Sequence, residues 1–295
     1  MAFNRAKFAN LYPFKSNYLL IDGHRYHYLD EGTGAPIVML HGNPTWSFYF
    51  RELVAKLRQS SRVIVPDHMG CGLSDKPSDS EYKYTLEERV RNLESLLESL
   101  NLKQPITLVL HDWGGMIGFS WATRNPERIA KLVVLNTAAF RLPSSKKLPW
   151  TLNFVRNAKP FGAIAVRGFN AFAGLATRMA VRQKLPANIA EGLTAPYDSW
   201  KNRIATLKFV EDIPLSESDE SYARVCETES KLELLKDKPM LIAWGRHDFV
   251  FDDHFLREWQ RRFPKAKVKV FEDAGHYVLE DASHEIVPLI SSFVT

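Results

Sequence analysis

The segment His111-Asp112-Trp113-Gly114-Gly115 decides the fold, because it joins two apolar runs of different character. The run before it, residues 106–110 (Ile-Thr-Leu-Val-Leu), is short and rich in branched residues, which predicts a buried strand. The run after it, residues 116–123, predicts a packed helix. A strand, a sharp turn and a helix in this order are typical of a nucleophile elbow, which presents one reactive side chain at the turn. In this chain that side chain is the carboxylate of Asp112.

Strands and helices alternate on both sides of this elbow. Asp22-Gly23 lies between two short apolar segments and predicts a β-hairpin. Thr85-Leu86-Glu87-Glu88 is a capping box that opens an amphipathic helix, and residues 283–293 predict a terminal helix. The predicted strands are residues 18–21, 26–29, 37–40, 63–65, 106–110, 129–135, 240–244 and 268–271. This order predicts an α/β protein with the α/β-hydrolase fold, built on a mostly parallel eight-stranded sheet.

The alternation breaks between about Phe140 and Ala223, where the sequence is helix-like and interrupted by Pro and Gly. We interpret this region as a helical cap inserted after the sixth strand. The predicted main domain comprises residues 1–140 and 224–295, and the predicted cap domain comprises residues 141–223.

The bulk composition is that of an ordinary globular enzyme, with 45% hydrophobic and 25% charged residues in a chain of 295. No apolar run approaches the roughly 18–20 residues that span a membrane. The segment Met1–Asn17 contains no apolar core of a signal peptide. Cys71 and Cys226 do not form a disulfide framework. We therefore expect a cytoplasmic protein.

The net charge of +5 is unevenly placed, because no Asp or Glu occurs between Glu127 and Glu191. The same stretch also carries the large aromatic side chains Trp150, Phe154, Phe161, Phe169 and Phe172. Its basic residues are Arg128, Lys131, Arg141, Lys146, Lys147, Arg156, Lys159, Arg167, Arg178, Arg182 and Lys184. This pattern fits a solvated surface, or a basic cap that contacts a peripheral membrane surface, a partner enzyme or a second copy in a homo-oligomer. No nucleic-acid-binding motif accompanies the charge, so no nucleic acid partner is expected.

An aspartate nucleophile needs a base, and the base needs an acid that orients it. In α/β-hydrolases these residues follow in the order nucleophile, acid, histidine. Asp248 directly follows the strand at residues 240–244, and His276 follows the last strand. Asn136 and Thr137, at the end of the preceding strand, offer no carboxylate. The predicted catalytic residues are therefore Asp112, His276 and Asp248.

The segment His41-Gly42-Asn43-Pro44 is expected to form the opposite wall of the site. Backbone N–H groups of Asn43 and Trp113 are placed to form an oxyanion hole. The Asn43 amide and the Trp113 indole can both donate to a departing anion, and neither carries a negative charge. The remaining histidines are interpreted as surface or packing groups: His24, His27, His41, His68, His111, His247, His254 and His284.

These segments resemble the haloalkane dehalogenases of the α/β-hydrolase superfamily over nearly the whole chain. The resemblance rests on residues 41–47 (His-Gly-Asn-Pro-Thr-Trp-Ser), residues 66–77 and residues 111–115. It implies that Asp112 is the nucleophile, His276 the base and Asp248 the acid, with Asn43 and Trp113 as the halide-stabilising pair. This combination is similar to the third dehalogenase subfamily, and to its near relatives, the OleB-type β-lactone decarboxylases of bacterial olefin biosynthesis. Leu110 departs from the small residue that serine hydrolases usually carry there.

The first functional hypothesis is hydrolytic dehalogenation of haloalkanes through an aspartyl ester, because the Asn–Trp pair suits a halide. The alternative is decarboxylation of a β-lactone to a long-chain alkene, which the basic, Phe-rich cap favours. Epoxide hydrolysis is a minor alternative, with Tyr197 and Tyr222 as proton donors, and a non-catalytic ligand-binding protein is another. The expected substrate is small and apolar, or apolar with long chains. No metal and no cofactor are expected.

Overall fold

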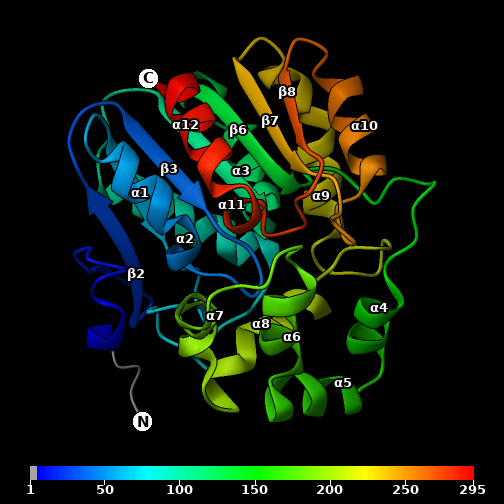
Figure 1. Ribbon diagram of the computed structural model, residues 1–295. Helices are drawn as coiled ribbons and strands as arrows, with labels where there is room; N and C mark the ends of the chain where they lie inside the picture. Colours follow the sequence, from blue (N-terminus) through cyan, green and yellow to red (C-terminus); the bar gives the residue numbers. More distant parts are fainter. Residues whose placement is uncertain (1–4) are drawn as a thin grey trace.

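A computed structural model describes residues 5–295, so the first four residues of the polar amino-terminal segment lie outside the described part. Its strands form one eight-stranded sheet, which runs through the centre of the molecule (Figure 1). The strands are β1 (Asn17–Ile21), β2 (His24–Glu31), β3 (Pro36–Leu40), β4 (Arg62–Pro66), β5 (Ile106–Asp112), β6 (Ile129–Thr137), β7 (Met240–Gly245) and β8 (Lys267–Phe271). Each predicted strand is present, with ends that differ by a few residues.

The strand order is β1-β2-β4-β3-β5-β6-β7-β8, and only β2 pairs antiparallel with its neighbours. The remaining pairs are parallel, which confirms the predicted α/β-hydrolase fold. Asp22 and Gly23 join β1 to β2 with φ of 49° and 83°. Two positive φ angles in succession are the geometry of the type I′ turn that the Asp-Gly pair predicts.

Helices cover both faces of the sheet (Figure 1). Side chains of α1 and α12 pack on one face, and side chains of α2, α3 and α10 pack on the other. The helices are α1 (Arg51–Leu57), α2 (Leu86–Ser99), α3 (Trp113–Ala122), α4 (Trp150–Asn157), α5 (Phe161–Ala163), α6 (Ala171–Met179), α7 (Ala187–Thr194), α8 (Ile204–Glu211), α9 (Tyr222–Lys231), α10 (Asp253–Arg262), α11 (Val278–Asp281) and α12 (Ser283–Val294).

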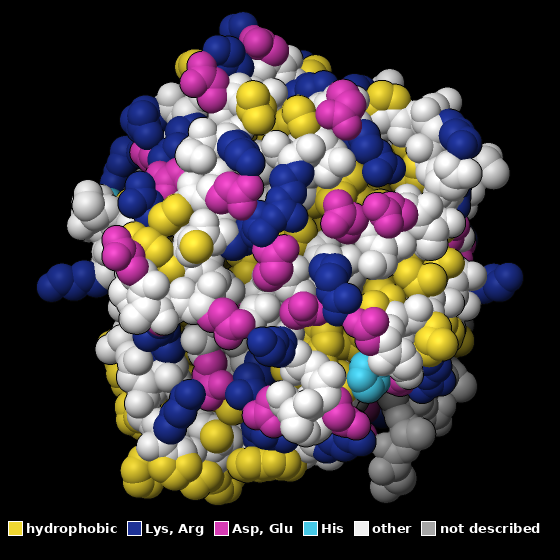
Figure 2. Space-filling view, turned by 180° about the vertical axis from the view of Figure 1, so that it is seen from behind, with side chains coloured by type: hydrophobic (Ala, Val, Ile, Leu, Met, Phe, Trp, Pro, Cys, Tyr) yellow, Lys and Arg dark blue, Asp and Glu magenta, His cyan; other side chains and the backbone are white. Residues whose placement is uncertain are grey.

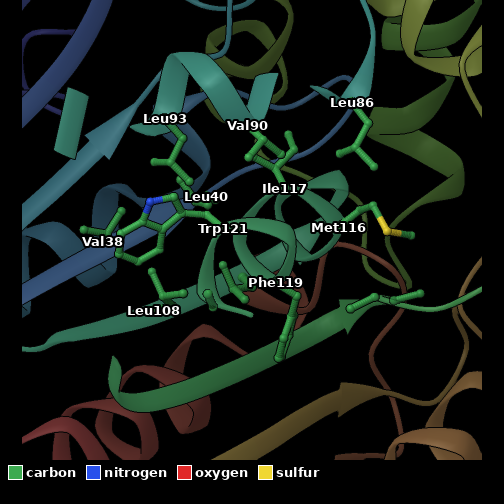
Figure 3. Close-up of a cluster of buried hydrophobic side chains, with 14 of the residues drawn as sticks. Val38, Leu40, Leu86, Val90, Leu93, Leu108, Met116, Ile117, Phe119 and Trp121 are labelled. Atoms are coloured by element: carbon green, nitrogen blue, oxygen red, sulfur yellow. The ribbon is translucent and has the colours of Figure 1, made fainter. Parts of the chain in front are cut away.

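The layer formed by α2 and α3 shows how the sequence pattern becomes a core. Thr85 caps α2 by accepting a hydrogen bond from Glu88 N, as the capping box predicts. The apolar stripe of α2 then meets α3 and the sheet, as Figure 3 shows for Val90, Leu93 and Trp121. Side chains alternate along β3, so that Val38 and Leu40 enter this layer while Ile37 and Met39 enter the opposite one.

Helices α4 to α8 lie between β6 and β7 in the chain and form a group below the sheet in Figure 1. The next helix, α9, packs against the main layer, because Thr228 Oγ1 lies 2.8 Å from Ser120 Oγ of α3. The division into a main domain (1–140 and 224–295) and a cap (141–223) remains a prediction. No helix within residues 5–295 has the length and apolar character needed to cross a bilayer.

Candidate active site

Asp112 ends β5 and precedes α3, with φ of 51° and ψ of −128°. A left-handed conformation at a non-glycine residue is strained, and such strain is typical of a nucleophile elbow. Two glycines make the close packing around it feasible. A Cβ at Gly42 would lie 2.0 Å from Asp112 Oδ1, and a Cβ at Gly118 would lie 2.4 Å from Leu110 Cδ2. Gly118 therefore accommodates the large Leu110 beneath the elbow.

The structure brings the three predicted catalytic side chains together from three loops at the ends of β5, β7 and β8. His276 Nδ1 lies 2.7 Å from Asp248 Oδ2, and His276 Nε2 lies 3.6 Å from Asp112 Oδ2. The other oxygen of Asp248 accepts hydrogen bonds from the backbone N–H groups of Val250 (2.7 Å) and Phe251 (3.0 Å). All three side chains are buried. Asp248 is thus fixed on both oxygens and orients the imidazole toward Asp112.

Burial and charge act in opposite directions on the pKa values of this pair. Burial raises the pKa of Asp112, although the nearby His276 and the backbone N–H groups of Asn43 and Trp113 oppose that shift. Burial alone would lower the pKa of His276, but the carboxylates of Asp248 and Asp112 outweigh it and raise that pKa. The site therefore favours a histidine that accepts a proton easily, beside a carboxylate poorly solvated by water.

Asn43 and Trp113 line the same cavity as Asp112. The backbone N–H of Asn43 donates to Asp112 Oδ1 at 2.8 Å. The side-chain amide of Asn43 donates to the carbonyl of Thr206 in α8 at 3.0 Å, which fixes its orientation. Within the described chain no hydrogen bond is found for the Trp113 indole N–H. One amide hydrogen of Asn43 and the indole hydrogen of Trp113 thus remain as donors for an anion.

Behind Asn43 and Trp113 lies a buried cation, Arg89, that was not predicted from the sequence. Arg89 of α2 is buried, and its guanidinium carbon lies 3.8 Å from the centre of the Phe209 ring and 5.5 Å from that of Trp113. It donates to Asp212 at 2.9 Å. Phe209 in turn lies 5.3 Å from Trp113, centre to centre. A basic residue on the apolar face of the α2 helix was the available signal.

Buried polar side chains that were not assigned to catalysis hold the surrounding loops and strands in place. His111 is buried, and its ring lies 4.7 Å from that of His276, centre to centre, at an angle of 44°. It donates to the backbone carbonyl of His276 at 2.8 Å. His68 donates to the carbonyl of His41 at 2.9 Å, next to Gly42. Asn136, which offered no carboxylate, instead bonds both the N–H and the C=O of Gly245 and ties β6 to β7.

A cavity of about 420 Å³ opens above Asp112, between the main domain and helices α4 and α6. Volumes of this size are typical of small-molecule sites. Apart from Thr151, every lining side chain from α4 and α6 is apolar. The one charged side chain outside the triad is Lys146, whose amine is held by Asp252 at 2.6 Å. The cavity is therefore a mostly apolar chamber, into which Asp112, His276 and Asn43 bring polar groups from the side of the sheet.

Tyr197 and Tyr222 do not line this cavity. Tyr197 is buried and donates to the carbonyl of Thr45 at 3.0 Å. The epoxide-hydrolase hypothesis thus lacks its two proton donors in this arrangement. Across residues 5–295, no three His, Cys, Asp or Glu side chains are grouped so that they could hold a metal ion.

Comparison with known proteins agrees with this geometry. Residues 35–283 match the family model described as alpha/beta hydrolase fold, and the chain belongs to this family. It is 53% identical to a cis-3-alkyl-4-alkyloxetan-2-one decarboxylase of Shewanella oneidensis, over 97% of this chain and 90% of that protein. It is 46% identical to the enzyme of the same name from Xanthomonas campestris pv. campestris, over 90% and 91% of the two chains.

A solved structure of the haloalkane dehalogenase DatA from Agrobacterium tumefaciens C58 superimposes with a TM-score of 0.84. The match covers 95% of this chain and 96% of the other, at 27% identity. Both enzyme classes expected from the sequence therefore occur among the relatives, and the decarboxylases are more similar in sequence than this dehalogenase.

Proposed function

We propose that this protein decarboxylates cis-3,4-dialkyl β-lactones to alkenes, with Asp112 as the nucleophile. The observation that carries the proposal is the apolar chamber of about 420 Å³ that ends at a buried carboxylate. A substrate with two alkyl chains and one compact polar ring matches that division. Two relatives named as decarboxylases of such lactones, matched over 90% and 91% of their length, support the same choice.

In the first step, Asp112 attacks the ring carbon that bears the ring oxygen, from the side opposite to that oxygen. The bond from this carbon to the ring oxygen breaks, and its electrons leave with the new substrate carboxylate. Asn43 and Trp113, which were predicted to bind a halide, then donate to that carboxylate. The product of the step is an alkyl ester of Asp112 that carries the carboxylate on the neighbouring carbon.

In the second step, the bond from the neighbouring carbon to the carboxylate breaks and carbon dioxide leaves. Its electron pair forms the carbon–carbon double bond, while the bond to the Asp112 oxygen breaks and returns the free carboxylate. Backside attack leaves the two departing groups opposite to one another. Their departure from that arrangement converts a cis lactone into a cis alkene, and no water is consumed.

This sequence gives His276 and Asp248 a role different from that in hydrolysis. His276 Nε2 lies 3.6 Å from Asp112 Oδ2, too far for a hydrogen bond and close enough for a charge to act. A protonated imidazole stabilises the carboxylate of Asp112 as it leaves the substrate. Asp248 keeps the imidazole in position and favours its charged form.

Dehalogenation is the second candidate, because the Asn43–Trp113 donor pair and Asp112 also suit attack on a halogen-bearing carbon. In that reaction His276 would deprotonate water, which attacks the carbonyl of the Asp112 ester. The 3.6 Å separation of His276 and Asp112 favours it specifically, since a water molecule attacking the ester would approach on that side.

A side-by-side assay tests the choice. One arm measures alkene formation from a cis-dialkyl β-lactone, and the other measures halide release from a short bromoalkane. We expect the larger kcat/KM for the lactone. A larger value for the bromoalkane would make dehalogenation the principal activity, and no turnover of either substrate would favour a ligand-binding role. A cytoplasmic location remains a prediction that this assay does not address.

A further inference from the structure

Large apolar side chains stand in solvent on one side of the cap. We call this surface the apolar cap face, and it comprises Trp150, Phe154, Phe161, Phe169, Leu175 and Met179. Phe169 and Trp150 are 80% and 79% exposed, and the other four are between 48% and 67% exposed. Figure 2 shows hydrophobic side chains gathered at the bottom of the molecule, where Figure 1 places α5 and α6. Exposed apolar surface of this extent marks an interaction site.

The apolar cap face surrounds the mouth of the active-site cavity. Trp150 and Phe154 are one turn apart on α4, and Leu175 and Met179 are one turn apart on α6. All four are exposed and also line the cavity. Phe161 and Phe169 are exposed but do not line it. The four side chains of α4 and α6 form a continuous apolar path from the outer surface of the face into the cavity. An apolar molecule can follow this path without leaving apolar contact.

The chain segment that carries this face is basic, and some of its cations are paired with acids of later segments, as Arg156 is with Asp219 and Lys159 is with Glu211. No acidic residue occurs from residue 128 to residue 190. Lys147, Arg178, Arg182 and Lys184 are exposed, and within residues 5–295 none of their side chains forms an ion pair. Unpaired cations beside exposed Trp, Phe and Leu side chains are the pattern of proteins that lie in the interface of an anionic bilayer.

We propose that the apolar cap face docks on the surface of an anionic lipid bilayer. Phe161 and Phe169 insert at the level of the headgroups, and the unpaired cations contact lipid phosphates. The mouth between α4 and α6 then faces the acyl chains, so a long-chain substrate enters from the lipid without crossing water. The exposed apolar side chains and the unpaired cations support the docking surface whatever the reaction is. The route of substrate entry rests on the proposed function.

Lipid explains this surface better than a second copy of the chain does. A symmetric dimer through the face would bring two sets of cations together, and like charges at an interface oppose association. A bilayer offers a deep apolar layer for the aromatic side chains and negative charge in the same plane.

Vesicle sedimentation tests the proposal with the full-length protein and no substrate. We expect binding to vesicles of phosphatidylcholine mixed with phosphatidylglycerol, weaker binding to phosphatidylcholine alone, and a decrease at high salt. The double variant Phe161→Ser/Phe169→Ser should lower the partition coefficient about tenfold. The pair Arg178→Gln/Lys184→Gln should lower it about tenfold on the anionic vesicles alone.

Leu20→Ser/Leu234→Ser is the matched control, since both residues are exposed outside the cap. This variant should bind as the parent does. Several results would overturn the proposal: no sedimentation with anionic vesicles, equal binding by the Phe161→Ser/Phe169→Ser variant and the parent, or an equal loss in the control. A dimer in light scattering that the Phe161→Ser/Phe169→Ser exchange dissociates would assign the face to a second copy instead.

Kinetics separate this proposal from the proposed function. The Phe161→Ser/Phe169→Ser variant should turn over a short, water-soluble β-lactone at the parental rate. It should lose about tenfold in rate on a long-chain lactone presented in anionic vesicles. If the parent binds vesicles but turns over no lactone, the proposed function fails while the docking surface stands. An equal rate of variant and parent on the vesicle-borne lactone would overturn entry from the lipid.

Discussion

The two walls of the cavity differ in almost every physical respect. The main-domain wall carries Asp112, His276 and Asn43, each fixed by hydrogen bonds or close charges. The cap wall, from α4 and α6, is apolar apart from Thr151 and is exposed where it forms the mouth. One wall is built to position charge and the other to contact hydrocarbon.

This difference separates chemistry from substrate choice. Buried carboxylates and an imidazole need a rigid frame, because their pKa values depend on fixed neighbours. Apolar contact needs only surface and volume, so the cap can vary without disturbing the triad. Substitutions in the main-domain wall should therefore affect kcat strongly, and those in the cap wall should affect KM and chain-length preference.

The largest effect is expected for Asp112→Asn, which removes the proposed nucleophile and changes the shape of the side chain little. Alkene formation should fall by about 10⁴-fold or more, with an unchanged circular dichroism spectrum. The measurement is kcat on a cis-dialkyl lactone, with mass spectrometry to detect deamidation back to Asp. Full activity of intact Asn protein would remove Asp112 from the chemistry.

His276→Phe should separate the two candidate reactions. With a bromoalkane, the ester of Asp112 should accumulate because no base activates water, and steady-state halide release should stop. With the lactone, turnover should continue with a loss of about 100-fold, because no water takes part. Intact-protein mass spectrometry detects the adduct. A lactone-derived adduct that persists in this variant would show that its breakdown requires the base.

Trp113→Phe removes one donor from the proposed anion site while an aromatic ring remains against Phe209. The expected loss in kcat is about 100-fold with the lactone, as for the removal of one oxyanion donor. Halide quenching of tryptophan fluorescence should also decrease. An unchanged kcat would mean that the indole N–H does not contact the leaving group.

Ala176→Phe tests the cap wall, because Ala176 lines the cavity from α6. The larger side chain fills part of the chamber, so kcat/KM on a long-chain lactone should fall about tenfold while a short-chain lactone is little affected. Ala187→Phe, at the exposed start of α7, is the control. Equal losses on both chain lengths would contradict the division between the two walls.

The smallest effect concerns pH. As the proposed nucleophile, Asp112 must be ionised to attack. Burial raises its pKa, so kcat/KM should fall on the acid side at a higher pH than for an exposed aspartate. The charge of His276 opposes that shift, so the acid limb should move to still higher pH in His276→Phe. If the acid limb of the kcat/KM profile stays at the same pH in His276→Phe, the limb belongs to another titrating group. The measurement is a pH profile of kcat/KM for both proteins.

Much of the main domain could be predicted from the sequence, because its signals are local. Asp112 is the last residue of β5, and Asp248 and His276 come three and five residues after the ends of β7 and β8. Parallel strands bring such positions to one edge of a sheet. Thr85 and the Asp22-Gly23 turn likewise act within a few residues.

Features that depend on contacts between distant segments could not be predicted. The place of Arg89 on the apolar face of α2 indicates burial but not its position under Trp113, because its partners Asp212 and Phe209 come from the cap region. The bond from Asn43 to Thr206 spans 163 residues. In the cap, the apolar stripes of α4 and α6 are short, and which of their side chains line the cavity depends on how the two helices pack.

The central claim is that Asp112 forms a bond to carbon and that the resulting ester decomposes by loss of carbon dioxide. Rapid-quench mass spectrometry of the peptide containing Asp112, during turnover of a cis-dialkyl lactone in ¹⁸O-labelled water, tests it directly. We predict a transient gain equal to the mass of the whole lactone, followed by return to the original mass without ¹⁸O as cis alkene appears. A peptide that never changes mass, or that returns with ¹⁸O in its carboxylate, would contradict the claim.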